Sequence, residues 1–247
     1  MLATLTLFML SCSNEVDGDN CNVGLTLEMF DQLKEISAYH SKGLDSCFDH
    51  YNDVLNSCET PDYSIKAIKK LSMDFVVENG DIESVHFTRS SDNAVLDENQ
   101  MHELSVGGET ILEEYFTLLL QSSSPESAEF GVKSIMQSES FSLLNEDEQS
   151  YLLFMMLIGI DSAKYWSDSE NYEKWQRIGK LEPTVDTKSP AGPPASSWIS
   201  SEQMSDPTFL RILQADVRGC GWSLLTGFAP WSWAAGGIAG SVDSALF

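Results

Sequence analysis

Hydrophobic residues recur at a spacing of three and four positions through most of the chain, a pattern that predicts amphipathic helices. The first predicted helix covers residues 26–39, and the second follows an interruption at Gly43. Two sets of apolar residues form their inner faces: Leu27, Phe30, Leu33 and Ile36, then Leu44, Phe48, Tyr51 and Leu55. One side of each helix is therefore expected to face a core.

A third helix is predicted to begin at Thr60 and Pro61, because a capping residue followed by proline is typical of a helix start. Gly80 is its expected stop. The helical pattern then weakens, so residues 84–88 are predicted to form a short strand and residues 90–99 a loop.

Helical spacing resumes in the second half of the chain. Ser124 followed by Pro125 predicts one helix start, and Asn145 with Glu148 predicts a capping box at another. The ten residues 151–160 that follow are apolar on every side of the helix. Such a run is too short to span a bilayer and predicts a helix at the centre of a bundle.

The C-terminal part of the chain has a different composition. Four of the eight prolines lie between residues 180 and 197, among Ser, Thr and Gly, which predicts an extended linker. A short helix is predicted for residues 207–218. Residues 219–242 carry no charge and include six glycines, and Pro230 divides them. We therefore expect two short glycine-rich helices joined as a hairpin.

These patterns predict a mainly α protein, a helical bundle with a proline-rich linker and a glycine-rich, apolar C-terminal helical hairpin. At 247 residues the chain is long enough to bury a sizeable core. The expected divisions are a signal segment at 1–11, an acidic tether at 12–24, a helical bundle domain at 25–178, a linker at 179–206 and an apolar tail at 207–247.

The chain is strongly acidic, with 38 Asp and Glu residues against 14 Lys and Arg and a net charge of -24. A field of this sign repels phosphate, so no nucleic-acid partner is predicted. Thirteen acidic residues between Leu71 and Val132 face a single base, Arg89. We interpret this segment as a solvated acidic face; the alternative is a docking surface for a basic partner or divalent cations.

A short apolar run at the N-terminus ends at Cys12 and gives way to polar and acidic residues. The residues Met9-Leu10-Ser11-Cys12 resemble the lipobox of Gram-negative bacterial lipoproteins, although no Lys or Arg precedes them as in most secretory signals. The resemblance implies an acylated Cys12 and a cell-envelope protein anchored in the outer membrane, facing the periplasm or the cell surface. The alternatives are a cleaved secretory peptide without lipid and a buried N-terminal segment.

The remaining cysteines are Cys21, Cys47, Cys58 and Cys220, which allow three pairings into two disulfides. On one straight helix Cys47 and Cys58 would lie about 16 Å apart along the axis, too far for a disulfide. Their separation of eleven residues is close to three turns, so both are expected to point inward as free buried thiols. A disulfide from Cys21 to one of the others stays open.

The apolar tail contains two groups of residues suited to membrane or partner contact: Trp222, Trp231 and Trp233, and Gly236, Gly240 and Ser244. Tryptophan rings favour a membrane interface, and small residues four apart allow close helix packing. The tail loosely resembles the glycine-zipper tails of membrane-active and bacteriocin-like peptides, although those are usually cationic. The alternative is that the tail folds back on the bundle or pairs with another copy of the chain.

Signals for catalysis are weak, and no catalytic residue, metal or cofactor is predicted. The four histidines show no metal-ligand spacing, and no nucleophile elbow, P-loop or dinucleotide fingerprint is present. Tyr165, Trp166 and Trp175 are a candidate stacking surface for sugars or peptides, but aromatic residues at helix ends more often border a core.

The sequence therefore predicts a non-catalytic cell-envelope lipoprotein that acts in interaction or membrane association. Its expected partners are the membrane, through acylated Cys12, and a protein or a second copy of the chain, through the tail. The alternative is a membrane-active or bacteriocin-like protein whose tail is the effector. An unrecognised hydrolase is the third hypothesis.

Overall fold

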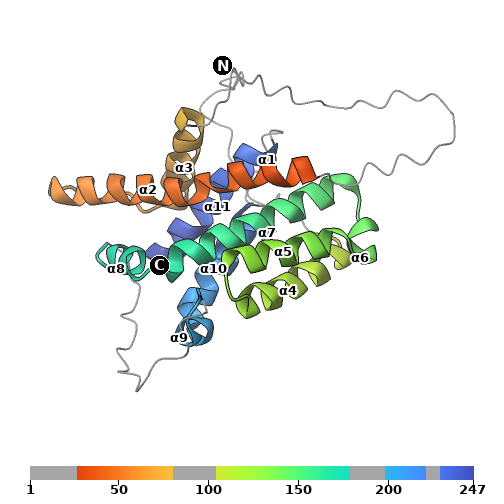
Figure 1. The fold of residues 1–247 in the computed structure, drawn as a ribbon. Helices are drawn as coiled ribbons and strands as arrows, with labels where there is room; N and C mark the ends of the chain where they lie inside the picture. The colour runs from red at the N-terminus through yellow and green to blue at the C-terminus, as the bar shows by residue number, and fades with distance from the viewer. Residues whose placement is uncertain (1–26, 80–103, 179–197, 221–228) are drawn as a thin grey trace, which may run out of the picture.

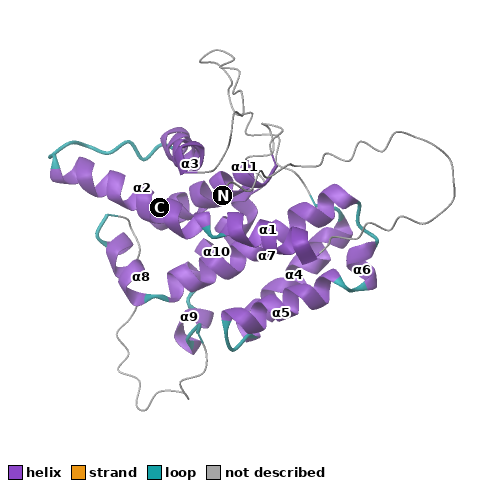
Figure 2. Cartoon of the chain, turned by 45° about the horizontal axis from the view of Figure 1, so that its top comes forward, coloured by secondary structure: helices purple, strands orange, loops and turns teal. Residues whose placement is uncertain are grey.

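The computed structural model describes residues 27–79, 104–178, 198–220 and 229–247, and every regular element within these ranges is a helix (Figures 1 and 2). This confirms the predicted mainly α helical bundle. Among the described helices, none combines the length and the hydropathy needed to cross a membrane.

The bounds of the helices follow the chain in three groups. The N-terminal group comprises α1 (Leu27–Ser37), α2 (Tyr39–Asn56) and α3 (Ile65–Asn79). The middle group comprises α4 (Val106–Gln121), α5 (Pro125–Met136), α6 (Glu139–Ser142), α7 (Glu146–Ser167) and α8 (Ser169–Gln176). The C-terminal group comprises α9 (Ser201–Ser205), α10 (Pro207–Gly219) and α11 (Ala229–Leu246).

Helix α7 lies at the centre of the bundle. It contacts α1 and α2 on one side, α4 and α5 on another, and α10 and α11 behind (Figure 1). Every residue from Tyr151 to Ile160 is buried. A helix surrounded by other helices needs an apolar surface on every side, so the prediction of a central helix is confirmed.

The C-terminal helices belong to the same core as the rest of the bundle. Helix α11 packs against α10, α3 and α2, and α10 packs against α7. From Trp233 to Val242, every residue of α11 is buried. The described helices of segments 25–178 and 207–247 therefore share one core, although the sequence predicts a separate bundle domain and tail.

The expected hairpin at Pro230 differs from the structure. Pro230 lies in the first turn of the single helix α11, where its missing N–H has no helical partner to lose. Proline at this position starts a helix instead of dividing one. The helix that packs antiparallel to α11 is α10, which ends at Gly219, and not a second helix formed on the other side of Pro230.

Two local predictions also differ from the structure. Gly43 lies inside α2 and does not interrupt it. A Cβ at this position would meet the Cδ1 of Ile238 at 2.2 Å, so the glycine allows α11 to pack closely against α2. Helix α3 begins after Ser64, whose hydroxyl accepts the N–H of Ala67, and not at Thr60. Each site depends on contacts or local hydrogen bonds that composition alone does not show.

The capping box predicted at the start of α7 is half present. Asn145 Oδ1 accepts the N–H of Glu148 at 2.9 Å, but the Glu148 side chain binds the backbone N–H of Ser105 at 2.6 Å. Ser105 is the N-cap residue of α4. The buried carboxylate of Glu148 thus links the starts of two helices, whereas the helix start led by Ser124 and Pro125 is confirmed at α5.

Several predictions lie outside the described residues. These are the signal segment and tether with Cys12 and Cys21, the short strand at 84–88, the loop at 90–99, residues 179–197 of the linker, and Trp222. Within the remainder of the predicted linker, residues 201–205 form α9, which begins with a complete capping box between Ser200 and Gln203.

Candidate functional site: a buried histidine between two aspartates

A cluster of polar side chains lies where α2, α7, α10 and α11 meet. His40, at the start of α2, has no exposed surface, and neither has Asp216 on α10. Asp161 and Ser162 come from α7 directly after its apolar run, and Ser241 comes from α11. Buried charge is costly unless it is paired, so this cluster is the most unusual feature of the core.

The pattern of α10 explains how an aspartate reaches this depth. The buried residues of this helix recur at helical spacing and include Asp216 among apolar neighbours: Phe209, Ile212, Leu213, Asp216 and Val217. Asp216 therefore occupies a core position of an amphipathic helix. The helix cannot turn this carboxylate to solvent without exposing its apolar face.

The imidazole of His40 lies between the two carboxylates. Its Nδ1 is 3.2 Å from Oδ2 of Asp161, and its Nε2 is 3.5 Å from Oδ2 of Asp216. Oδ2 of Asp161 also accepts the backbone N–H of Ser41 at 3.0 Å and the hydroxyl of Ser41 at 2.6 Å. Asp161 is thus held by the first turn of α2, while Asp216 faces the opposite edge of the ring.

The carboxylate of Asp216 is held from α7. Its Oδ2 accepts the hydroxyl of Ser162 and, at 3.2 Å, the indole N–H of Trp166. The same indole nitrogen lies 3.0 Å from the hydroxyl of Ser241 on α11. Nε2 of His40 and Oδ1 of Asp216 have no hydrogen-bond partner, and among the buried side-chain polar atoms of the described residues this is otherwise true only of Nε1 of Trp233.

The two ionisable groups shift each other's protonation. Burial by itself lowers the pKa of His40, but the hydrogen bond to Asp161 and the charges of Asp216 and Asp161 outweigh it, so this pKa lies above 6.5. Burial raises the pKa of Asp216 from 3.8 to about 6, although His40 and three hydrogen-bond donors act in the opposite direction. Both residues therefore bind a proton more tightly in the fold than in the unfolded chain.

The cluster is not arranged as a nucleophile with its base. In such sites a serine hydroxyl donates to the histidine, which a carboxylate orients from the other side. Here the hydroxyls of Ser41 and Ser162 donate to carboxylates instead. The chemistry that this geometry offers is the retention of a proton on an imidazole between two carboxylates.

The residues predicted for membrane or partner contact lie mainly inside the fold. Trp233 is 6% exposed, and its ring centroid lies 5.5 Å from those of Tyr151 and Phe154. Ser244 is half-buried, and its backbone carbonyl accepts Nη2 of Arg211 at 3.0 Å. Trp222 and the side chain of Trp231 lie outside the described residues.

The small residues of the tail do allow close helix packing, but the neighbouring helix belongs to the same chain. A Cβ on Gly240 would lie 2.4 Å from the carbonyl oxygen of Ala215, and one on Gly219 would lie 2.6 Å from that of Gly236. Helices α10 and α11 therefore touch backbone to backbone. Of the alternatives for the tail, the structure shows the one in which it folds back on the bundle.

The candidate stacking surface at the end of α7 is not formed. Tyr165, Trp166 and Trp175 are at most 4% exposed and pack against one another in the core. The indole N–H of Trp175 donates to the hydroxyl of Tyr165, which in turn donates to Asp45 at 2.9 Å. These aromatic residues border the core, which is the expectation that the sequence favours for aromatic residues at helix ends.

Two further predictions concern metals and thiols. Within the described ranges, no group of three acidic, histidine or cysteine residues is placed to hold a metal ion. Cys47, Cys58 and Cys220 carry thiols and not disulfides. Cys58 is exposed, so the prediction that it points inward is wrong: α2 ends at Asn56, and Cys58 turns into a left-handed conformation with φ of 59°.

The histidine cluster could not be found from the sequence, because its members come from distant parts of the chain. Asp161 and Asp216 follow His40 by 121 and 176 positions. A weak signal existed in Asp216, an acidic residue at a core position of the helix predicted for residues 207–218. The partner of that aspartate could not be read from spacing, because it depends on how α2 and α10 are placed around α7.

Comparisons with protein-family models, with curated proteins and with solved structures found no match to this chain.

Proposed function

We propose that this protein is a lipid-anchored, non-catalytic component of a bacterial cell envelope, tethered through Cys12, whose helical body contacts a partner. The lipobox-like residues Met9-Leu10-Ser11-Cys12 support the anchor. Each CH₂ group of an acyl chain contributes about 0.8 kcal/mol to membrane binding when it is buried in the bilayer. A multiply acylated cysteine therefore needs no spanning helix to hold the protein on a membrane.

The observation that carries this proposal is the burial of α11 inside the bundle. The apolar tail was the other candidate for membrane contact, and its side chains from Trp233 to Val242 are covered by neighbouring helices. A helix that supplies the core of its own domain is not available to a bilayer while the domain is folded. Attachment to the membrane then depends on the N-terminal segment.

The burial of α11 also weighs against the tail as a membrane-active effector. Release of α11 would expose Trp233 and Ile238 and leave the apolar inner face of α10 without its neighbour. Each large apolar side chain contributes about 1.5–3 kcal/mol when buried. An effector role would therefore require much of the bundle to unfold first.

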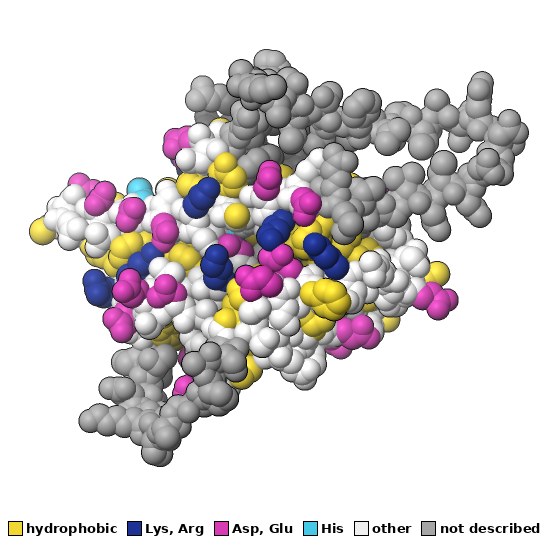
Figure 3. All heavy atoms as spheres, viewed as in Figure 1, with side chains coloured by type: hydrophobic (Ala, Val, Ile, Leu, Met, Phe, Trp, Pro, Cys, Tyr) yellow, Lys and Arg dark blue, Asp and Glu magenta, His cyan; other side chains and the backbone are white. Residues whose placement is uncertain are grey.

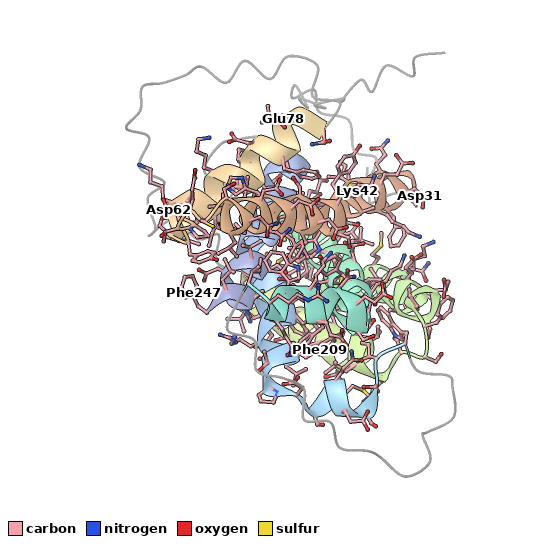
Figure 4. All side chains as sticks on the ribbon, turned by 90° about the vertical axis from the view of Figure 1, so that its left-hand side faces the viewer. Asp31, Lys42, Asp62, Glu78, Phe209 and Phe247 are labelled. Atoms are coloured by element: carbon pink, nitrogen blue, oxygen red, sulfur yellow. The ribbon has the colours of Figure 1, made fainter. Side chains whose placement is uncertain are left out.

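The exterior of the body is suited to contact with other proteins. Lys and Arg side chains lie among Asp and Glu across the face shown in Figure 3, with hydrophobic atoms between them. Charged side chains such as Asp31, Lys42, Asp62 and Glu78 lie at the periphery (Figure 4). Within the part of the chain that the structure describes, three large apolar side chains are at least 74% exposed: Val106, Phe130 and Leu143.

The anchor is tested by the mature N-terminus and by cell fractionation. We expect mass spectrometry to find an N-terminal peptide that begins at acylated Cys12, and Cys12→Ala to leave the membrane fraction. Cys21→Ala is the matched control, because it removes a nearby cysteine outside the lipobox. A mature protein without lipid, or a Cys12→Ala protein that stays with the membrane as the control does, refutes the anchor.

Membrane activity is tested separately with liposomes. We expect the folded full-length protein to cause no leakage of dye from vesicles with an outer-membrane-like phospholipid composition. Leakage caused by the folded protein, and lost when Trp233 is replaced, would support the effector hypothesis instead. Because this assay does not depend on Cys12 acylation, its result is separable from the fractionation result.

A further inference from the structure

We propose that His40, Asp161 and Asp216 form a proton-operated latch that holds α10 and α11 against α2 and α7. With a proton on both ring nitrogens the latch is closed, and loss of one proton weakens it. The inference concerns the folded body alone and does not depend on lipid at Cys12.

The geometry around the ring favours the doubly protonated imidazole. Each nitrogen faces a carboxylate oxygen, with Nδ1 3.2 Å from Asp161 and Nε2 3.5 Å from Asp216. A neutral imidazole has one N–H and one lone pair. One of its nitrogens would then present a lone pair to a carboxylate, whereas the imidazolium presents an N–H to both.

Loss of the proton leaves Asp216 without a cation. Asp216 is fully buried, and a buried charge without an opposite charge is strongly destabilising. Its remaining donors are the Ser162 hydroxyl and the Trp166 indole on α7 and the Ser241 hydroxyl on α11, all of them neutral. Protonation of His40 is therefore the source of positive charge that allows this carboxylate to remain ionised in the core.

Loss of the positive charge beside Asp216 is expected to weaken the packing of α10 against α11. Asp216 lies one turn from Gly219, where α10 touches the backbone of α11. Ser241 of α11 shares the Trp166 indole with Asp216. A displacement of α10 that hydrates Asp216 would separate these contacts, so the response to pH is expected to be largest in the C-terminal helices.

The charged groups that act on the ring come from two helices. Helix α7 contributes Asp161 and α10 contributes Asp216, while α2 adds the hydroxyl of Ser41 to Asp161 and α11 adds only the hydroxyl of Ser241. The thiol of Cys220 also lies close to Asp216. Burial is the main cause that raises the pKa of this thiol further into the alkaline range, and the charge of Asp216 is the second cause. No Lys or Arg charge is among the causes that shift the pKa of His40 or of Asp216.

The direction of the pH response follows from the two shifts. The pKa of His40 is raised in the fold, so its contribution is complete below pH 6.5 and is lost as the pH rises through the folded value. The pKa of Asp216 is raised from 3.8 to about 6, so ionisation of this carboxylate also opposes folding as the pH rises. The latch is therefore closed in mild acid and loosened in alkali.

The direct test is a titration of the histidine rings by NMR in the full-length protein. We expect His40 to half-titrate above pH 6.5, and Asp216→Asn, which removes one flanking charge, to lower that midpoint. A His40 midpoint at or below 6.5 in the natural protein overturns the latch even if no variant folds. An unchanged midpoint in a folded Asp216→Asn protein overturns the role of Asp216.

The second test measures stability against pH by urea unfolding, with hydrogen exchange of α10 and α11 as a local readout. One retained proton changes the folded-to-unfolded ratio by about tenfold per pH unit between the unfolded and folded pKa values of His40. We expect the natural protein and the control His50→Gln, at an exposed position of α2, to show this slope, and His40→Gln/Asp216→Asn to lose it. Equal slopes of stability against pH in all three proteins would refute the latch. Hydrogen exchange in α11 that does not become faster as the stability falls with rising pH would also refute it.

Discussion

The contact between α10 and α11 predicts that one methyl group at Gly240 will be poorly tolerated. In Gly240→Ala the new Cβ would lie 2.4 Å from the carbonyl oxygen and 3.1 Å from the carbonyl carbon of Ala215. It would also lie 3.2 Å from the Cα of Gly219. All three atoms belong to the backbone, so no side chain can rotate away, and the two helices must separate.

The size of the effect follows from that separation. Close carbon-to-oxygen contacts lie at about 3.3–3.6 Å, so the backbones must move apart by about 1 Å. Overpacking of a core costs about 1–3 kcal/mol and occasionally more, and alanine returns about 1 kcal/mol through its higher helix propensity. Because the obstacle is rigid, we expect an overpacking cost of about 3 kcal/mol and a net loss of about 2 kcal/mol, or about 4–8 °C in Tm.

The matched control is Gly237→Ala in the same helix. Its Cβ would meet its nearest neighbours at 3.3–3.4 Å, which is tight but not prohibitive. The gain in helix propensity should offset the contact, so we expect a change within about 1 kcal/mol. Both variants are measured by urea unfolding and thermal melting. A Gly240→Ala protein as stable as Gly237→Ala would refute the close packing of α10 on α11.

Three further predictions concern individual sites. Cys58→Gly should stabilise the protein by about 0.5–1 kcal/mol in urea unfolding, because glycine accepts the left-handed conformation with φ of 59°, and a loss of stability would contradict this reading of the helix end. In the native protein a thiol reagent should modify Cys58 before Cys47 and Cys220, because Cys58 is exposed and the other two are buried. Burial raises the pKa of Cys47 to about 12. Rapid modification of Cys47 at pH 8 would therefore count against the described core. Glu148→Ala should cost about 1–3 kcal/mol, because it leaves the N–H of Ser105 unpaired, and an unchanged urea midpoint would show that the link between α4 and α7 is dispensable.

The Cys58 site shows why a helix end is difficult to read from sequence. The N–H groups of Cys58 and Glu59 return to the carbonyls of Leu55 and Val54, as in a Schellman motif. Glycine usually occupies the left-handed position of this motif, and it is the residue by which such an end is recognised. With cysteine there, periodicity alone suggested that the helix continued.

Helical periodicity by itself determined the fold class and the central helix. Residues 151–160 are apolar on every side, and only a helix enclosed by others can bury such a surface, which is where α7 lies. Local capping chemistry likewise located the start of α5 at Ser124 and Pro125. These features depend on neighbours within one or two turns, and such neighbours are visible in the sequence.

Only the tertiary structure decided what the apolar tail contacts. Glycine spacing at Gly236 and Gly240 indicates that a backbone will approach closely, but it does not distinguish a membrane partner, a second copy or a helix of the same chain. The packing of α11 on α10 made that choice, and the same arrangement brought His40 to Asp216. A sequence records which surfaces must be covered, whereas the identity of the covering element depends on the relative placement of helices that are distant along the chain.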